Sequence, residues 1–168
     1  MSHQTKAHLA WRFRQWYKNR ALLSAIAGPP LREILNQMHA STALAASDPR
    51  SFTLYACHDI TILGLLYGLG ASFLADDQVD WMYYWPPYAG TLALELVRTT
   101  TGQWRVRVLL DGTPVHSVDF YQRSGGTSGN HHPDLATTTD GMLCISDFER
   151  LVEKLEEDGG EAAKLEGC

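Results

Sequence analysis

The fold is decided by residues 52–67, which read FTLYACHDITILGLLY. The first six residues form a short apolar run that predicts a buried strand, and the residues from Ile60 onward predict a helix. His58 and Asp59 lie at the junction, so we expect them at the carboxyl end of a sheet, where open α/β sheets bind their ligands. The start of a helix also favours an anion. The junction therefore predicts a site for phosphate chemistry.

The same dipeptide also has a purely structural interpretation. Asp is a favoured N-cap residue, so Asp59 would need to do no more than cap the helix that begins near Ile60. His58 would then be a hydrogen-bonded histidine at the end of a strand. Structural caps greatly outnumber catalytic pairs, so other parts of the chain must decide between the two interpretations.

The composition fits one globular domain. The chain has 168 residues, of which 45% are hydrophobic and 20% are charged, and this length allows a sizeable core. The net charge of −5 and the pI near 5.7 argue against a general nucleic-acid binder. No apolar stretch is long enough to span a bilayer, and the first residues lead into no signal-peptide core.

The sequence offers little that would bind a metal. Cys57, Cys144 and Cys168 lie far apart, with no Cys-x-x-Cys spacing, and we expect Cys57 to be a small buried filler. The adjacent His131 and His132 lie in a Gly- and Ser-rich segment without a third ligand at a clear spacing. We expect no metal and no cofactor, and the disulfide state of Cys144 and Cys168 stays open.

Two helices are predicted before the decisive stretch. The first covers about 6–26 and ends at Gly28-Pro29-Pro30, and the second covers about 31–46. Basic and aromatic residues alternate in the first helix, which is typical of an amphipathic helix with packed stems and solvated charges. These residues are Trp11, Arg12, Phe13, Arg14, Trp16, Tyr17, Lys18 and Arg20.

After the decisive stretch, the pattern predicts a helix at about 60–69 that closes at Gly70, and then a hairpin. Its strands are 92–97 and 104–109, and a turn signal follows at Asp111-Gly112. A capping box at Ser146–Glu149 predicts a last helix. We expect one domain over 1–156, made of a helical segment (1–47) and an α/β portion (50–156), followed by a frayed acidic tail at 157–168.

Three elements, in this order, resemble the C-terminal part of the histidine acid phosphatases, the acid phosphatase and phytase branch of the histidine phosphatase superfamily. Leu54–Thr61 is similar to the family's His-Asp motif, and Trp85–Leu96, which reads WPPYAGTLALEL, to its Pro-Pro-Tyr-Ala segment and following strand. Cys144–Leu151 is similar to the cysteine and closing helix near the family's C-terminus. With the helix at 31–38, the resemblance covers about residues 28–155. It implies an α/β fold of phosphoglycerate-mutase-like topology, with a sheet flanked by helices.

The chain departs from the family at the nucleophile. In the family, a His within an Arg-His-Gly motif near the start of the domain attacks phosphorus. None of the seven histidines here follows an Arg or precedes a Gly. We therefore expect the C-terminal portion of a family domain, with only the His-Asp half of its site.

The resemblance implies hydrolysis of phosphate monoesters through a phosphohistidine, without a metal. His58 would bind the phosphate, and Asp59 would donate a proton to the leaving group. Thr61 is a candidate helper, although a capping role is the simpler interpretation, and Glu95 is expected to be a strand partner or a solvated charge. Five aromatic residues would either line an entrance to the site, where they would recognise the organic part of the substrate, or serve as packing. They are Trp81, Tyr83, Tyr84, Trp85 and Tyr88.

Other interpretations stay open at this stage. One alternative is that the chain is an inactive remnant. Another is that it is an α/β domain that binds an anion or a partner. Beyond a small phosphate monoester, the expected partners are a second copy of the chain or the missing N-terminal half, because strand 52–57 would otherwise leave a sheet edge unpaired. The family resemblance suggests a secreted, lysosomal or membrane-anchored protein.

Overall fold

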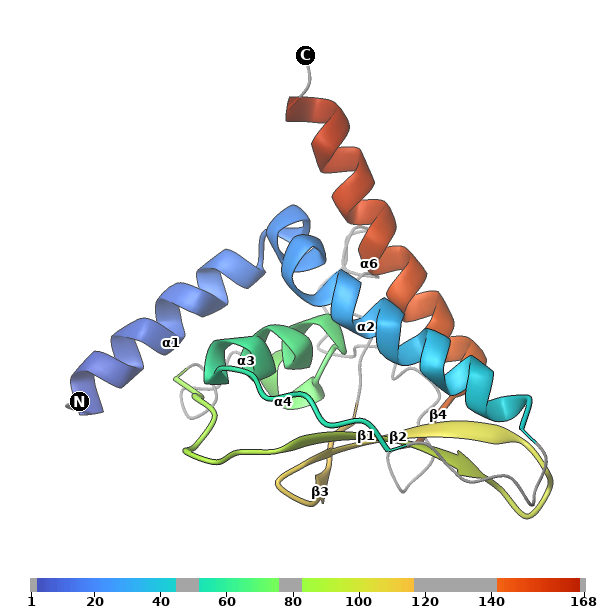
Figure 1. Ribbon diagram of the computed structural model, residues 1–168. Coiled ribbons are helices and arrows are strands. Elements are labelled where there is room, and N and C mark those ends of the chain that lie inside the picture. The colour runs from blue at the N-terminus through green and yellow to red at the C-terminus, as the bar shows by residue number, and fades with distance from the viewer. Residues whose placement is uncertain (1–2, 45–51, 76–82, 117–141, 167–168) are drawn as a thin grey trace, which may run out of the picture.

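The computed structural model describes residues 3–44, 52–75, 83–116 and 142–166. The described helices lie on one side of an antiparallel sheet (Figure 1), which is an α/β arrangement as predicted. The elements follow the order α1 (His3–Tyr17), α2 (Arg20–Thr42), α3 (Asp59–Gly68), α4 (Ser72–Ala75), β1 (Leu92–Arg98), β2 (Trp104–Leu110), β3 (Thr113–Pro114), β4 (Met142–Cys144) and α6 (Ile145–Glu166).

The sheet is organised around β2. β1 pairs with β2 in antiparallel register along its whole length, and β3 and β4 pair with β2 on its other side. Asp111 and Gly112 connect β2 to β3 with φ values of 49° and 80°, as a two-residue hairpin turn of the inverse type requires. The predicted hairpin of 92–97 with 104–109 and the turn at Asp111-Gly112 are confirmed.

The core lies between the sheet and the helices. Val106 and Val108 on β2 are no more than 1% exposed, and they belong to one cluster with residues of α2, α3 and α6. α2 packs against both α3 and α6. The helical residues of this core that are fully buried include Ala27, Leu31 and Leu35 of α2, Leu66 of α3, and Phe148, Val152 and Leu155 of α6.

The predicted break between the first two helices was placed wrongly. α2 runs through Pro29 and Pro30, and the break falls at Asn19, whose side-chain Oδ1 accepts a hydrogen bond from Leu22 N at 3.2 Å. A proline inside a helix costs about 3 kcal/mol because it lacks a backbone N–H and clashes with the preceding turn. The buried face of α2, which continues on both sides of the prolines, offsets that cost.

The predicted strand at 52–57 is also corrected. Residues 52–58 form no regular element and are exposed, and they enter no ladder with the described strands. An apolar run forms a buried strand only where neighbouring strands supply hydrogen bonds and cover, and within the described chain none does so. The segment instead lies along α2, where the Thr53 hydroxyl donates to Gln37 Oε1 at 2.8 Å.

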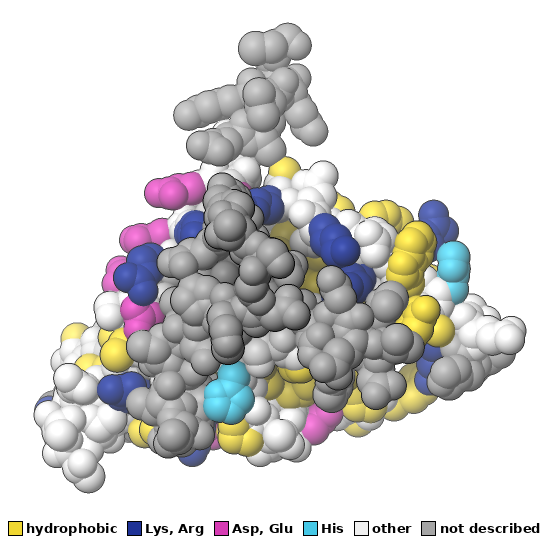
Figure 2. Space-filling model, turned by 180° about the vertical axis from the view of Figure 1, so that it is seen from behind, with side chains coloured by type: hydrophobic (Ala, Val, Ile, Leu, Met, Phe, Trp, Pro, Cys, Tyr) yellow, Lys and Arg dark blue, Asp and Glu magenta, His cyan; other side chains and the backbone are white. Residues whose placement is uncertain are grey.

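Helix α3 ends as predicted, because Gly70, with φ +66°, follows its C-cap Leu69. α6 differs from the prediction: it begins at Ile145, ahead of the expected capping box, and continues to Glu166 through most of the expected acidic tail. Figure 2, seen from behind, shows most of the visible acidic side chains on the side where α6 lies and many hydrophobic ones toward the α1 end, whereas basic side chains lie on both sides. Among the described helices, none combines the length and apolar character that a membrane crossing needs.

Candidate functional site

His58 and Asp59 lie at the start of α3, and both are exposed. His58 is the N-cap residue, in an extended conformation and with no side-chain capping bond. Asp59 is the first residue of the helix, so the structural interpretation in which Asp59 is the N-cap is wrong. The positive end of the helix dipole and the exposed His58 thus occur at the same turn, and both favour an anion there.

The Asp59 carboxylate is held by two donors. Trp85 Nε1 donates to Oδ2 at 2.7 Å, and the backbone N–H of Ile60 donates to Oδ1 at 2.8 Å. Trp85 is the first residue of the Trp-Pro-Pro-Tyr segment, so this bond joins two motifs that lie 26 residues apart in the sequence. Each oxygen of the carboxylate has one donor, which fixes the orientation of the group while leaving it accessible to solvent.

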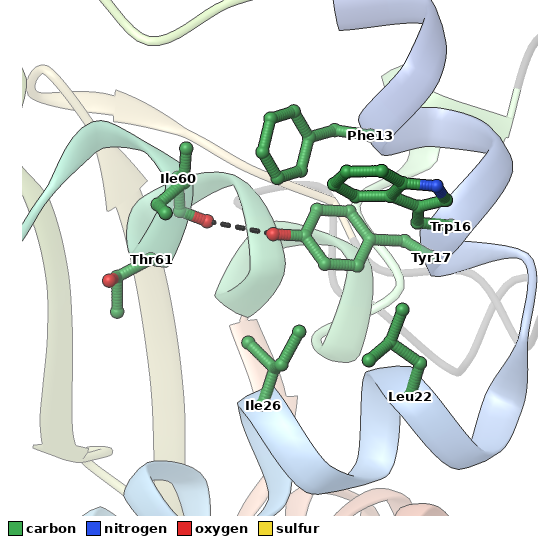
Figure 3. Close-up of a pocket in the computed structure, with 7 residues that line it drawn as sticks. All are labelled: Phe13, Trp16, Tyr17, Leu22, Ile26, Ile60 and Thr61. Atoms are coloured by element: carbon green, nitrogen blue, oxygen red, sulfur yellow. Dashed lines mark hydrogen bonds between the residues drawn. The ribbon is translucent and has the colours of Figure 1, made fainter. Parts of the chain in front are cut away.

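A cavity of about 470 Å³ lies beside this turn, between α1, the beginning of α2 and the first turn of α3. Ile60 and Thr61, the two residues that follow Asp59, form part of its wall. The remaining lining is apolar or aromatic (Figure 3) and consists of Phe13, Trp16, Tyr17, Leu22 and Ile26.

Two contacts connect this cavity to the His-Asp turn. The Tyr17 hydroxyl donates to the backbone oxygen of Ile60 at 3.1 Å, as Figure 3 shows. Phe13 packs edge-to-face on Trp85, the donor to Asp59, with ring centroids 5.5 Å apart. α1 therefore helps to position both the first turn of α3 and the tryptophan that binds Asp59. Sequence reasoning missed this role, although the aromatic stripe of the first helix was a signal for it.

The basic cluster of α1 is only partly solvated. Arg14 is 4% exposed, whereas its neighbour Arg12 is exposed and lies over the Trp16 ring. Burial raises the pKa of Tyr67 to about 12, and Arg14, which hydrogen-bonds to that phenol, opposes the shift. The expectation of solvated charge therefore fails for Arg14, which supports the aromatic packing of α1 on α3.

The aromatic residues predicted to line an entrance or to serve as packing have different surroundings. Tyr84 packs edge-to-face on Phe73 at 5.1 Å, and burial raises the pKa of Tyr84 to about 12. Tyr88 is 94% exposed, with Lys6 over its ring. Tyr83 is half-exposed, and Trp81 lies outside the described residues.

Other candidates occupy places away from this turn. Glu95 pairs with Arg107 across the β1–β2 ladder, and Arg107 Nε donates to it at 2.7 Å, which confirms the strand-partner interpretation. Cys57 is exposed, so its expected role as a buried filler is wrong, because the strand that was to bury it is not formed. His131, His132 and Cys168 lie outside the described residues. In the described part of the chain, no group of three or more His, Cys, Asp or Glu side chains is placed to hold a metal ion.

Comparison with protein families decides the relationship. The family model for the histidine phosphatase superfamily (branch 2) matches residues 7–111, more than half of the chain. The chain belongs to the histidine phosphatase superfamily, branch 2. A comparison with curated proteins finds no match. Membership of this superfamily supports a phosphatase-type function.

The matched region of this histidine phosphatase begins earlier and ends earlier than the sequence resemblance suggested. It contains α1 from residue 7 onward, the His58-Asp59 turn, the Trp85 segment and the β1–β2 hairpin. Cys144 and the closing helix α6 lie beyond it. The superfamily match thus covers most of α1 and the first turn of α3, which line the same cavity. It also covers Trp85, which donates a hydrogen bond to Asp59.

Proposed function

We propose that the chain is of the histidine acid phosphatase type and takes part in hydrolysing phosphate monoesters through a phosphohistidine intermediate. The observation that carries the proposal is the Asp59 carboxylate, which Trp85 and Ile60 orient at the N-terminus of α3, beside His58. The superfamily match over this region supports it. The finer assignment to the acid phosphatase and phytase type rests on the Pro-Pro-Tyr-Ala segment that begins at Pro86.

In this proposal, His58 donates a hydrogen bond to a phosphoryl oxygen, together with the positive end of α3. Asp59 gives its proton to the oxygen of the leaving group as the P–O bond breaks and the nucleophilic histidine forms a P–N bond. A deprotonated Asp59 then takes a proton from the water that hydrolyses the P–N bond. Protonation matters because an alkoxide is a poor leaving group, and a positioned acid contributes ~10²–10⁴-fold to such steps.

We propose further that this chain supplies only the His-Asp half of the site. No histidine among its seven lies in an Arg-His-Gly motif. The nucleophile, and the arginines that accompany it in the family, would then come from a polypeptide outside these 168 residues. The alternative is a catalytically inactive domain that binds an anion through His58 and the start of α3.

We propose that the cavity beside the turn binds the organic part of the substrate. Its wall begins at Ile60, directly after the proposed proton donor, and its lining is almost entirely apolar. Its volume of about 470 Å³ falls within the range of about 300–1,000 Å³ that is usual for small-molecule sites. A leaving group protonated by Asp59 would have a short path into it.

Hydrolysis of 4-nitrophenyl phosphate at about pH 5 tests the half-site proposal. The isolated chain is expected to show little or no turnover, because it lacks the nucleophile. Adding the Arg-His-Gly-bearing part of the domain should give turnover that vanadate inhibits and that depends on His58. Robust turnover by the isolated chain, abolished by His58→Ala, would contradict the half-site and require a nucleophile within this chain.

A further inference from the structure

The two donors to Asp59 differ in how they constrain its carboxyl group. The backbone N–H of Ile60 belongs to the next residue, so this bond moves together with the first turn of α3. The indole Nε1–H of Trp85, which donates to Oδ2 at 2.7 Å, comes from a segment 26 residues further along the chain. Of these two donors, Trp85 is therefore the one that fixes the carboxyl group relative to another part of the fold.

Neither donor can compete with a substrate for the proton of Asp59. An indole N–H and a backbone N–H only donate hydrogen bonds, so neither nitrogen can take up the proton that a carboxylic acid gives away. A carboxylate has about four lone-pair sites, and Asp59 is exposed. Two donors therefore orient the group and still leave room for the oxygen of a leaving group.

Trp85 is itself held in place from three directions. Pro86, which is buried, follows it in the chain, and a residue before proline is confined to extended backbone conformations. Phe13 of α1 packs edge-to-face on the indole, with ring centroids 5.5 Å apart and an angle of 62° between the ring planes. The Trp85 side chain also packs against the hydrophobic core. The donor is thus fixed before a ligand binds, as preorganisation requires.

We propose that Trp85 is a positioning residue for proton transfer, which holds the Asp59 carboxyl group in the orientation that protonates the leaving group. The inference rests on the proposed role of Asp59 as the acid. Proton transfer requires the acid within about 2.6–3.2 Å of the leaving oxygen. A misplacement of about 1 Å can lower a rate by ~10²-fold. Phe13 supports the indole, so α1 belongs to the same arrangement.

NMR of the full chain tests whether Trp85 holds the carboxyl group. Three-bond couplings across the Cα–Cβ bond of Asp59 should report a single rotamer in the wild-type chain and an average over rotamers in Trp85→Phe, which keeps an aromatic ring but lacks the N–H. Trp104→Phe is the matched control. Trp104 is also half-buried, but it lies on β2 with Arg98 over its ring, and the substitution should leave the couplings unchanged. Circular dichroism shows whether both variants are folded.

Kinetics distinguish positioning of the acid from general support of the fold. They use this chain together with the Arg-His-Gly-bearing part of the domain. Trp85→Phe should lower kcat for an alkyl phosphate by about 10- to 100-fold, with little change in KM and a much smaller loss for 4-nitrophenyl phosphate. Adding Trp85→Phe to Asp59→Asn should cause no further loss, because both substitutions remove the same acid function.

The results separate this inference from the proposed function. An Asp59 side chain that keeps a single rotamer in Trp85→Phe would overturn the positioning role. So would equal losses of kcat for the two substrates in Trp85→Phe where Asp59→Asn loses mainly the alkyl phosphate. Equal losses for the two substrates in Asp59→Asn itself would instead overturn the role of Asp59 as the acid, and the inference about Trp85 with it.

Discussion

At the scale of single residues, two neighbouring side chains, His58 and Asp59, have different surroundings. Asp59 has a donor on each carboxylate oxygen, whereas the His58 side chain has no hydrogen-bond partner in the described part of the chain. The oriented carboxyl group of Asp59 suits the transfer of a proton. The His58 imidazole, which is available to a ligand, suits the binding of phosphate.

This division predicts how Asp59→Asn behaves in a complete domain that contains the nucleophile. The turnover of an alkyl phosphate should fall by ~10²–10⁴-fold, because an amide cannot protonate the alkoxide. The turnover of 4-nitrophenyl phosphate should fall much less, because nitrophenolate leaves without help. Steady-state kinetics with the two substrates measures both effects, and an equal loss for the two would contradict the role of Asp59 as the acid.

At the scale of elements, α3 is positioned by a close approach to α2. A Cβ added at Gly68 would lie 2.7 Å from the Ala27 Cβ, so Gly68→Ala forces the two helices apart. We expect a loss of about 1–2 kcal/mol in the free energy of unfolding. Gly160→Ala in α6 is the control, since nothing lies within 4 Å of its added Cβ, and it should gain about 0.5–1 kcal/mol. Urea unfolding of both variants checks this, and equal effects would argue against the close packing of α2 and α3.

The cavity between α1, α2 and α3 gives a second prediction at this scale. Leu22→Trp should fill the cavity and weaken binding of 1-naphthyl phosphate by about tenfold, while binding of inorganic phosphate stays the same. Leu44→Trp is the matched control, because Leu44 is equally exposed, at 38%, and does not line the cavity. Calorimetric titration of the two ligands measures both affinities. Unchanged binding of 1-naphthyl phosphate by Leu22→Trp would show that the cavity does not bind the organic group.

The elements also show what local pattern can predict. The β1–β2 hairpin and the end of α3 followed from alternation and from glycines that need positive φ, which are local signals. The passage of α2 through Pro29 and Pro30 did not, because it depends on packing against α3 and α6. Whether residues 52–57 form a strand depends on partner strands, which no local pattern specifies. The hydrogen bond from Trp85 to Asp59 likewise joins two motifs, and their separation in the sequence does not predict that they are in contact.

At the scale of the whole molecule, an exposed ion pair joins the helices α2 and α6. Arg32 Nε donates to Glu156 Oε1 at 2.9 Å, and this bond lowers the pKa of Glu156. A lowered pKa in the folded state adds stability above the unfolded pKa of about 4.3, and that contribution is lost as the pH falls through the folded value. Both side chains are about one-third or more exposed, so solvent screening limits the contribution to about 0.2–1 kcal/mol.

This ion pair makes the stability of the wild-type chain fall more between pH 7 and about pH 3 than that of Arg32→Gln. Arg150→Gln removes an ion pair with Asp147 within α6 and should keep the pH dependence that comes from Glu156. Urea midpoints at the two pH values give the comparison. An unchanged pH dependence in Arg32→Gln would show that the α2–α6 ion pair does not contribute.

We propose that His58 and the start of α3 form the phosphate-binding half of a phosphatase site. Titration of inorganic phosphate into the ¹⁵N-histidine-labelled chain, followed by NMR, tests it most directly. We expect the ring signals of His58 to shift with saturation and those of His8, His39 and His116 to stay nearly unchanged. The Asp59→Asn variant should retain the binding. A His58 ring that phosphate does not perturb, while the chain is folded, would contradict it.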